Sequence, residues 1–328
     1  MSEPVLPALP DEAYAGAGNG KVPQLNYFNR PLLRKLHWDE RVITYLFLGG
    51  AMGGSGVLAA LAQRSGNEPL TRTSRYLSLA LAVACPAVLV SHLGRPERFH
   101  HMLRIAKLKS PMSMGAWALV GFGALAALNA GGQLSRDGVL PAWIRRLEAP
   151  FGVRLQGMLG AFTTGYTGVL LSATAVPLWA RGKYHIPAAS VCSAIASACA
   201  LNSLALTRDR NGGEAQIKLE RLEACASVLE LGLLLHFRSH AGATGKPMFE
   251  GARGERLRTW TIGAGILAPL ALNAISLLTR NHKKRPFVLR ALLGGALTLA
   301  GGYIFRETLI EAGKASCEDP EQAFYQSK

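Results

Sequence analysis

The sequence predicts an all-α integral membrane protein, a bundle of eight transmembrane helices preceded by a short amphipathic helix. Of its 328 residues, 49% are hydrophobic and 17% are charged. The apolar residues gather in blocks of roughly 17–25 residues, the length that crosses a bilayer as a helix. Glycine and alanine are frequent within these blocks, and in lipid such small residues let helices pack closely. The blocks lie near residues 42–61, 74–90, 114–130, 152–178, 187–206, 222–237, 260–278 and 287–305.

The domain organisation follows from these blocks. Residues 1–30 contain repeated prolines and a glycine-rich stretch, which predicts a disordered or extended arm. Residues 31–41 alternate leucine with charged side chains, which predicts an amphipathic helix lying in the membrane interface. The eight-helix domain covers residues 42–305, and the charged residues that follow predict a polar C-terminal tail over 306–328.

Charge and cysteine content exclude several classes of protein. The net charge of +15 does not indicate nucleic-acid binding, because the basic residues lie in loops, where cationic side chains meet lipid headgroups. The five cysteines form no CxxC pair, whereas iron–sulfur clusters need grouped thiolates. The eight histidines fall at span ends or in loops, whereas bis-histidine haem ligation needs histidines deep in facing helices. We therefore expect no metal, haem or iron–sulfur cluster in this chain.

Titratable residues collect toward one membrane side when eight spans are threaded back and forth. His37 precedes the first span on that side, and the second span delivers His92 and Arg95 to it. The fourth and sixth spans run the same way and carry Tyr166 and Glu230. A quinone needs hydrogen-bond donors for its two carbonyls and a route for two protons, which histidine, tyrosine and carboxylates supply. The sequence therefore predicts a site where a lipid-soluble redox carrier meets titratable side chains.

Glu230 is the least ordinary of these residues. A carboxylate inside an apolar span costs several kcal/mol unless it is paired, protonated or hydrated, so such residues are typically functional. Glu223 lies seven residues earlier, on the same helical face, and the two together predict a proton path. Each other residue also has a structural interpretation: His92 as a solvated interfacial histidine, Tyr166 as a packed aromatic and Arg95 as an anchor for lipid phosphates.

Five motifs follow one another over about the first half of the chain, and in this order they resemble one known family. The motifs are Tyr45-Leu46-Phe47-Leu48-Gly49-Gly50, Leu93-Gly94-Arg95-Pro96 with Phe99, Ser110-Pro111-Met112-Ser113 with Gly115 and Trp117, Gly165-Tyr166-Thr167-Gly168-Val169, and Pro177-Leu178-Trp179. The series resembles the NrfD / polysulfide reductase membrane-subunit (PsrC-like) family.

The resemblance implies a multi-pass subunit of the bacterial inner membrane that oxidises or reduces menaquinone or ubiquinone and has no redox cofactor of its own. Electrons pass to or from a docked ferredoxin-like iron–sulfur subunit, and through it a molybdopterin or multihaem cytochrome subunit. The family's quinone pocket maps to His37, His92 and Tyr166, with Arg95 orienting the loop and Glu230 carrying protons. The family commonly has an aspartate at the position of His92, and a histidine exchanges protons with a different pKa and a positive acid form.

Two other functions are compatible with the same residues. A transporter or an ion channel that uses Glu230 and the basic loops predicts substrate flux by the isolated chain in liposomes. A structural membrane anchor without quinone chemistry, which the histidine at position 92 supports, predicts a complex that holds no quinone and resists quinone-analogue inhibitors. As the membrane subunit of a quinol-dependent oxidoreductase complex, the chain alone is expected to be non-catalytic.

Overall fold

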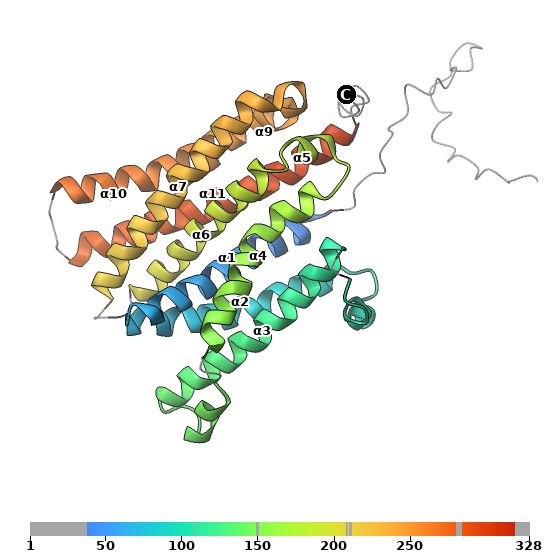
Figure 1. Ribbon diagram of the computed structural model, residues 1–328. Helices are drawn as coiled ribbons and strands as arrows, with labels where there is room; N and C mark the ends of the chain where they lie inside the picture. The colour runs from blue at the N-terminus through green and yellow to red at the C-terminus, as the bar shows by residue number, and fades with distance from the viewer. Residues whose placement is uncertain are drawn as a thin grey trace, which may run out of the picture.

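The computed structural model describes residues 38–107, 109–148, 151–207, 209, 212–279 and 284–318. In these ranges the regular secondary structure is helical, which confirms the all-α class. A long helical segment overlaps each predicted block (Figure 1): α1 (Glu40–Arg64), α2 (Glu68–His92), α3 (Pro111–Arg136), α4 (Gly152–Ser172), α6 (His185–Leu206), α7 (Gly213–Ala241), η6 (Leu257–Leu267) continued by α10 (Ala268–Thr279), and α11 (Lys284–Glu318). Shorter helices lie between them: η3 (Pro96–Leu103), η4 (Ala142–Leu147), α5 (Pro177–Arg181), η5 (Gly242–Gly245), α8 (Lys246–Phe249) and α9 (Gly251–Arg256).

Part of the predicted organisation falls on residues that the structure does not describe. The N-terminal arm, residues 31–37 of the predicted amphipathic helix, His37 and the chain after residue 318 lie outside the described ranges. Residue 39 caps α1, so residues 40 and 41 of the predicted interfacial helix already belong to the first long helix.

Four of the described helices are long and apolar enough to cross a membrane, namely α1, α2, α3 and α6. The segment α4 is rich in glycine and threonine, and α7 begins with charged residues. These compositions lower the hydropathy of both helices although each is at least 21 residues long. The structure thus supports a multi-pass membrane protein, and the number of eight spans stays a prediction.

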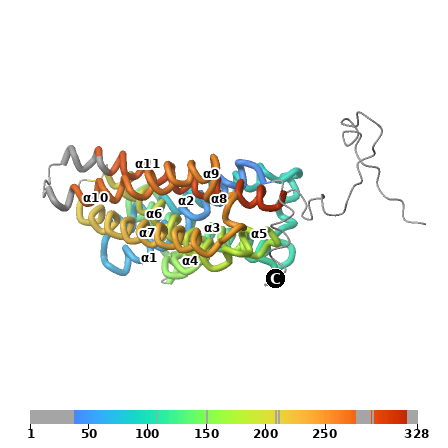
Figure 2. Tube along the Cα trace, turned by 90° about the horizontal axis from the view of Figure 1, so that it is seen from above, coloured from blue at the N-terminus to red at the C-terminus, as the bar shows by residue number. Residues whose placement is uncertain are grey.

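The long helices form two groups that share a central seam. Helices α1 to α4 make up one group, and α6, α7, η6 with α10, and α11 make up the other (Figures 1 and 2). Helix α1 contacts α2 and α4 in its own group and α6 and α11 in the other. The apolar windows of α1 and α6 are 67% buried, against 22% for α2 and 28% for α3. Therefore α1 and α6 lie at the centre, and α2 and α3 turn most of their apolar surface outward.

Glycines on α1 allow close helix crossings. A Cβ atom added to Gly53 on α1 would lie 2.5 Å from the carbonyl oxygen of Gly160 on α4, and Gly54 on the neighbouring face meets Ala198 of α6 at 2.6 Å. Real Cβ atoms essentially never come so close. The glycine-rich run in the first span therefore lets α1 pack against two helices at once, as small residues do in membrane bundles.

The fourth predicted block ends earlier than expected. It was predicted to run to residue 178, but α4 ends at Ser172 and Pro177 opens the separate helix α5. Val176 is extended because the ring of a following proline disfavours the helical conformation. The short helix is fixed by Trp179, whose indole Nε1 donates a hydrogen bond to the Leu309 carbonyl oxygen at 2.9 Å and whose ring stacks on Trp38 with centroids 5.3 Å apart.

The structure corrects the prediction of a polar tail from residue 306, because the helix α11 continues to Glu318. The charged residues of this stretch lie among apolar ones, and Leu309, Ile310 and Ala312 are completely buried. They belong to the same core cluster as Trp179. The average composition of residues 306–318 indicates a polar tail. The spacing of their apolar residues, however, gives the helix one face that packs into the core.

Candidate functional site

The first functional residues lie where α1 begins and α2 ends. The Asp39 side chain caps α1: its Oδ1 atom accepts hydrogen bonds from the backbone nitrogens of Arg41 at 3.0 Å and Val42 at 3.4 Å. The same oxygen lies 3.0 Å from Nδ1 of His92, the last residue of α2. Arg41 adds a second link, since its Nη1 donates to the Ser91 carbonyl oxygen at 2.6 Å. We call Asp39 and His92 the rim pair.

The rim pair is accessible to water and ionisable. The side chain of Asp39 is 50% exposed and that of His92 is 26% exposed. Desolvation acts to raise the pKa of Asp39, but the hydrogen bond and charge of His92 and the two backbone donors outweigh it, so the carboxyl pKa lies below its ordinary value. Asp39 therefore stays a carboxylate acceptor for the imidazole well into the acid range.

Arg95 is not part of this pair. It is exposed and precedes η3, where its carbonyl oxygen accepts a hydrogen bond from the Arg98 backbone nitrogen at 3.1 Å. Arg95 therefore lies in the connection between α2 and α3 and does not line the Tyr166 cavity.

Tyr166 lies deeper, in a small cavity between α1, α2, α3 and α4. The residue is 8% exposed, and its ring packs against Gly115, where an added Cβ would lie 2.6 Å from Tyr166 Cε2 and closer still to the hydroxyl. The tyrosine therefore fits because residue 115 has no side chain. The cavity has a volume of about 20 Å³ and is lined by Tyr45, Leu46, Gly49, Gly50, Met52, Cys85, Gly115, Leu119, Thr163, Tyr166 and Thr167.

The rim pair and the Tyr166 cavity lie at the same end of the first helix group but at different depths. Cys85, which lines the cavity, precedes His92 by seven residues on α2, or roughly 10 Å at the helical rise per residue. Tyr45 follows Asp39 by six residues on α1 and also lines the cavity. His92 does not line it. The structure thus stacks two predicted site residues along the bundle without direct contact between them.

Glu230 belongs to the second helix group. It is 3% exposed and lies eleven residues before the end of α7, roughly 16 Å below that end. It lines a small cavity together with Ser193, Ser227, Thr261 and Thr298. The Thr298 Oγ1 atom donates to the Glu223 carboxylate at 2.6 Å. Glu223 and Glu230 therefore lie on the same side of α7. Thr298 of α11 donates a hydrogen bond to Glu223 and lines the cavity that Glu230 also lines.

Arg306 is a buried charge that the sequence analysis missed. It is completely buried on α11, and its Nη1 donates to Ser193 Oγ at 3.2 Å and to the Gly302 carbonyl oxygen at 2.8 Å. Its Nε and Nη2 atoms have no hydrogen-bond partner among the described residues. An added Cβ at Gly50 would lie 2.9 Å from Nη2. The only sequence signal was an arginine directly after the last apolar block, which predicted the start of a tail.

Three histidines meet near the start of α6 and the end of α7. The His185 Nε2 atom lies 2.7 Å from His236 Nδ1, and the rings of His236 and His240 have centroids 4.0 Å apart. Within the described ranges, no group of three or more His, Cys, Asp and Glu residues is arranged to hold a metal ion. The cluster is therefore a set of three neighbouring imidazoles held together by ring contacts and by the contact between His185 and His236.

Comparisons with known proteins complete the description of the site. A model of the family described as Polysulphide reductase, NrfD matches residues 31–318 of the chain. The match includes the rim pair, the Tyr166 cavity and the buried charges of the second helix group. No curated protein matches the chain.

Proposed function

The chain belongs to the NrfD family of polysulphide reductases, and from this premise we propose that it is the quinone-reactive membrane subunit of a respiratory oxidoreductase. Members of this family are membrane subunits of polysulfide- and quinol-linked oxidoreductases. The proposed partners are a ferredoxin-like iron–sulfur subunit and, through it, a molybdopterin or multihaem cytochrome subunit. The proposed location is the bacterial inner membrane, with menaquinone or ubiquinone as the carrier.

The rim pair is the observation that carries this proposal. The family commonly has an aspartate directly before the Leu-Gly-Arg-Pro motif, and here that position is His92. Asp39, at the start of α1, brings a carboxylate to 3.0 Å from the His92 imidazole. The end of α2 therefore retains a carboxylate beside a second proton-exchanging group, which is what general acid–base chemistry on a quinol needs.

The chemical groups around Tyr166 suit a quinone, but the cavity that Tyr166 lines is smaller than a quinone ring. A quinone supplies transfer of two electrons and two protons when it is bound. Tyr166 lines the cavity and carries a hydroxyl, which is a hydrogen-bond donor, and Met52 and Leu119 are apolar lining residues. A cavity of 20 Å³ has room for about one water molecule. A quinone ring therefore enters only when side chains move apart, which the flexible Met52 allows.

The buried charges of the second helix group support a proton route. Glu230, the hydroxyls of Ser193 and Thr298, and Glu223 follow one another between α6, α7 and α11. Buried carboxylates in membrane helices are expensive and typically functional. In the proposed function Glu230 exchanges the proton, and Arg306 holds Ser193 through a hydrogen bond.

Two variants of the assembled complex test the proposed function. Tyr166→Phe removes one neutral hydrogen bond, so we expect kcat/KM for quinol to fall by about 2- to 13-fold, the equivalent of roughly 0.5–1.5 kcal/mol. His92→Ala removes the imidazole of the rim pair and should also slow quinol oxidation.

The matched controls are Tyr184→Phe and His100→Ala, which change an exposed tyrosine and an exposed histidine. Both controls should leave turnover unchanged. Wild-type turnover in Tyr166→Phe and His92→Ala, with the complex fully assembled, would exclude both residues from the quinol site. Substrate flux through the isolated chain in liposomes would favour a transporter instead.

A further inference from the structure

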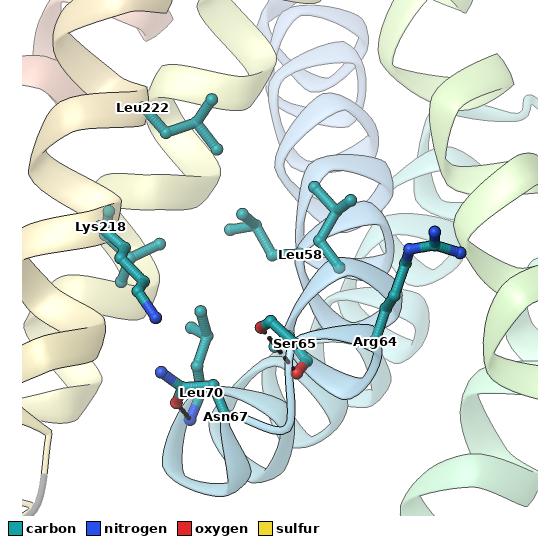
Figure 3. A pocket seen from close by; sticks show the side chains of 10 residues that line it. Leu58, Arg64, Ser65, Asn67, Leu70, Lys218 and Leu222 are labelled. Carbon is teal, nitrogen blue, oxygen red and sulfur yellow. Dashed lines mark hydrogen bonds between the residues drawn. The ribbon is translucent and has the colours of Figure 1, made fainter.

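A large cavity lies at the end of the molecule opposite to the rim pair. Its volume is about 440 Å³, within the range of roughly 300–1,000 Å³ that is typical of small-molecule sites. It is formed where the turn between α1 and α2 faces the first turns of α7 (Figure 3). None of the residues assigned above to quinol oxidation or proton transfer lines it.

The lining changes from apolar to polar toward the end of the helices. Leu58, Leu70 and Leu219 form part of the floor, and they belong to a core cluster with residues of α6. Ser65, which follows the last residue of α1, lies seven residues beyond Leu58, roughly 10 Å closer to the membrane surface. A phospholipid has the same order, with acyl chains inside and a polar headgroup outside. The full lining is Leu58, Leu61, Ala62, Arg64, Ser65, Asn67, Leu70, Lys218, Leu219 and Leu222.

Lys218 is the cation that faces this cavity. In Figure 3 its ammonium extends toward Asn67 at the turn between α1 and α2, whereas Arg64 points away on the other side of α1. Lys218 Nζ lies 2.7 Å from Glu214 Oε1, and the two side chains are 52% and 78% exposed. Such an exposed pair is weak, and an ammonium has three donors. Lys218 therefore remains able to bind a second anion.

Asn67 supplies a second polar group beside Lys218. Its Oδ1 atom accepts a hydrogen bond from the Leu70 backbone nitrogen at 3.1 Å, which caps α2. This contact fixes the side chain and leaves its amide nitrogen as a donor. An ammonium and an amide next to each other, above an apolar floor, are complementary to a phosphate that is linked to a hydrocarbon chain.

We propose that this cavity binds a glycerophospholipid with an anionic headgroup, with one acyl chain between α1 and α7 and the phosphate at Lys218 and Asn67. Ten residues line the cavity, fewer than the roughly 20–30 residues per side of a specific protein interface. The groove therefore suits a chain-shaped ligand better than a protein surface. The net charge of +15 favours an anionic over a neutral lipid, as basic pockets between membrane helices do.

Native mass spectrometry of the full-length chain in detergent tests the proposal. The delipidated protein is titrated with phosphatidylglycerol, with diacylglycerol of the same acyl chains, and with inorganic phosphate alone. We expect one phosphatidylglycerol to be retained. Diacylglycerol should bind at least about tenfold more weakly, since it lacks the charge-assisted hydrogen bonds of the phosphate. Inorganic phosphate alone should not be retained.

Two pairs of variants locate the site. Lys218→Gln should weaken phosphatidylglycerol binding by about tenfold or more, whereas Arg154→Gln, which removes an exposed charge on α4 that does not line the cavity, should leave it unchanged. Leu222→Trp should block binding by filling the cavity, whereas Leu229→Trp changes an outward leucine of the same helix, 61% exposed, and should not.

Several results would overturn the proposal. They are equal retention of diacylglycerol and phosphatidylglycerol, retention of phosphatidylglycerol by Leu222→Trp, and equal losses in Lys218→Gln and Arg154→Gln. Size-exclusion chromatography of each variant checks that it is folded, and the Leu222→Trp pair tests the site independently of Lys218. Quinol oxidation is expected to be the same in all four variants, so this test and that of the proposed function fail separately.

Discussion

Gly115→Ala tests how Tyr166 is held. A Cβ atom at position 115 would overlap the tyrosine ring, at 2.6 Å from Cε2, and inserting a methyl group into a packed site costs about 1–3 kcal/mol. Gly123 lies on the same helix and has no atom within 4 Å of an added Cβ. Alanine is favoured over glycine inside a helix by roughly 0.5–1 kcal/mol, and this gain applies to both variants.

The difference in free energy of unfolding between Gly115→Ala and Gly123→Ala therefore isolates the overlap, and we expect it to be about 1–3 kcal/mol. The assay is unfolding of both purified variants in the same detergent, followed by tryptophan fluorescence. If the tyrosine moves to relieve the overlap, quinol oxidation by the assembled complex falls in Gly115→Ala and not in Gly123→Ala. Equal stability and equal turnover of the two variants would refute the packing of Tyr166 described here.

Three further predictions concern the rim pair, the proton route and α5. Asp39→Asn keeps a good helix cap but removes the charge beside His92. Because the folded-state pKa of Asp39 lies below its ordinary value of 3.8, the wild-type advantage in unfolding free energy should be complete above that pH and disappear as the pH falls below it; an advantage that persists in strong acid would contradict the ion pair. Glu230→Gln should lower the pH change that accompanies quinol oxidation in proteoliposomes, and an unchanged signal would remove Glu230 from the route. Gly313→Ala places a methyl group against the Trp179 indole and should destabilise the fold by about 1–3 kcal/mol, measured by thermal unfolding; an unaltered melting temperature would contradict that contact.

The helices could be predicted from the sequence because the apolar blocks and glycine runs record two strong physical constraints, burial of apolar side chains in lipid and close helix packing. Prediction from composition failed at residues 306–318. The charged residues there made the segment polar on average, although its apolar face is buried in the cluster that contains Trp179. Composition averages over a helix, whereas packing depends on which side of it each residue lies.

The site was predicted only in part, because its contacts join residues that are distant in sequence. His92 and Tyr166 lie near the same end of the bundle, and their different depths depend on how α2 and α4 each pack against α1. Asp39 was assigned to a predicted interfacial helix, and its contact with His92 joins positions 53 residues apart. The burial of Arg306 could not be predicted, because its hydrogen-bond partner Ser193 lies on α6, 113 residues away in the sequence.

Gly50 lies between the Tyr166 cavity of one helix group and Arg306 of the other. One side of its backbone lines the Tyr166 cavity, and an added Cβ on the other side would meet the Arg306 guanidinium. A single turn of main chain therefore separates the two halves of the molecule at this point. Inserting one residue ahead of it would rotate the rest of α1 by about 100°, so a single insertion would disturb the packing of both halves.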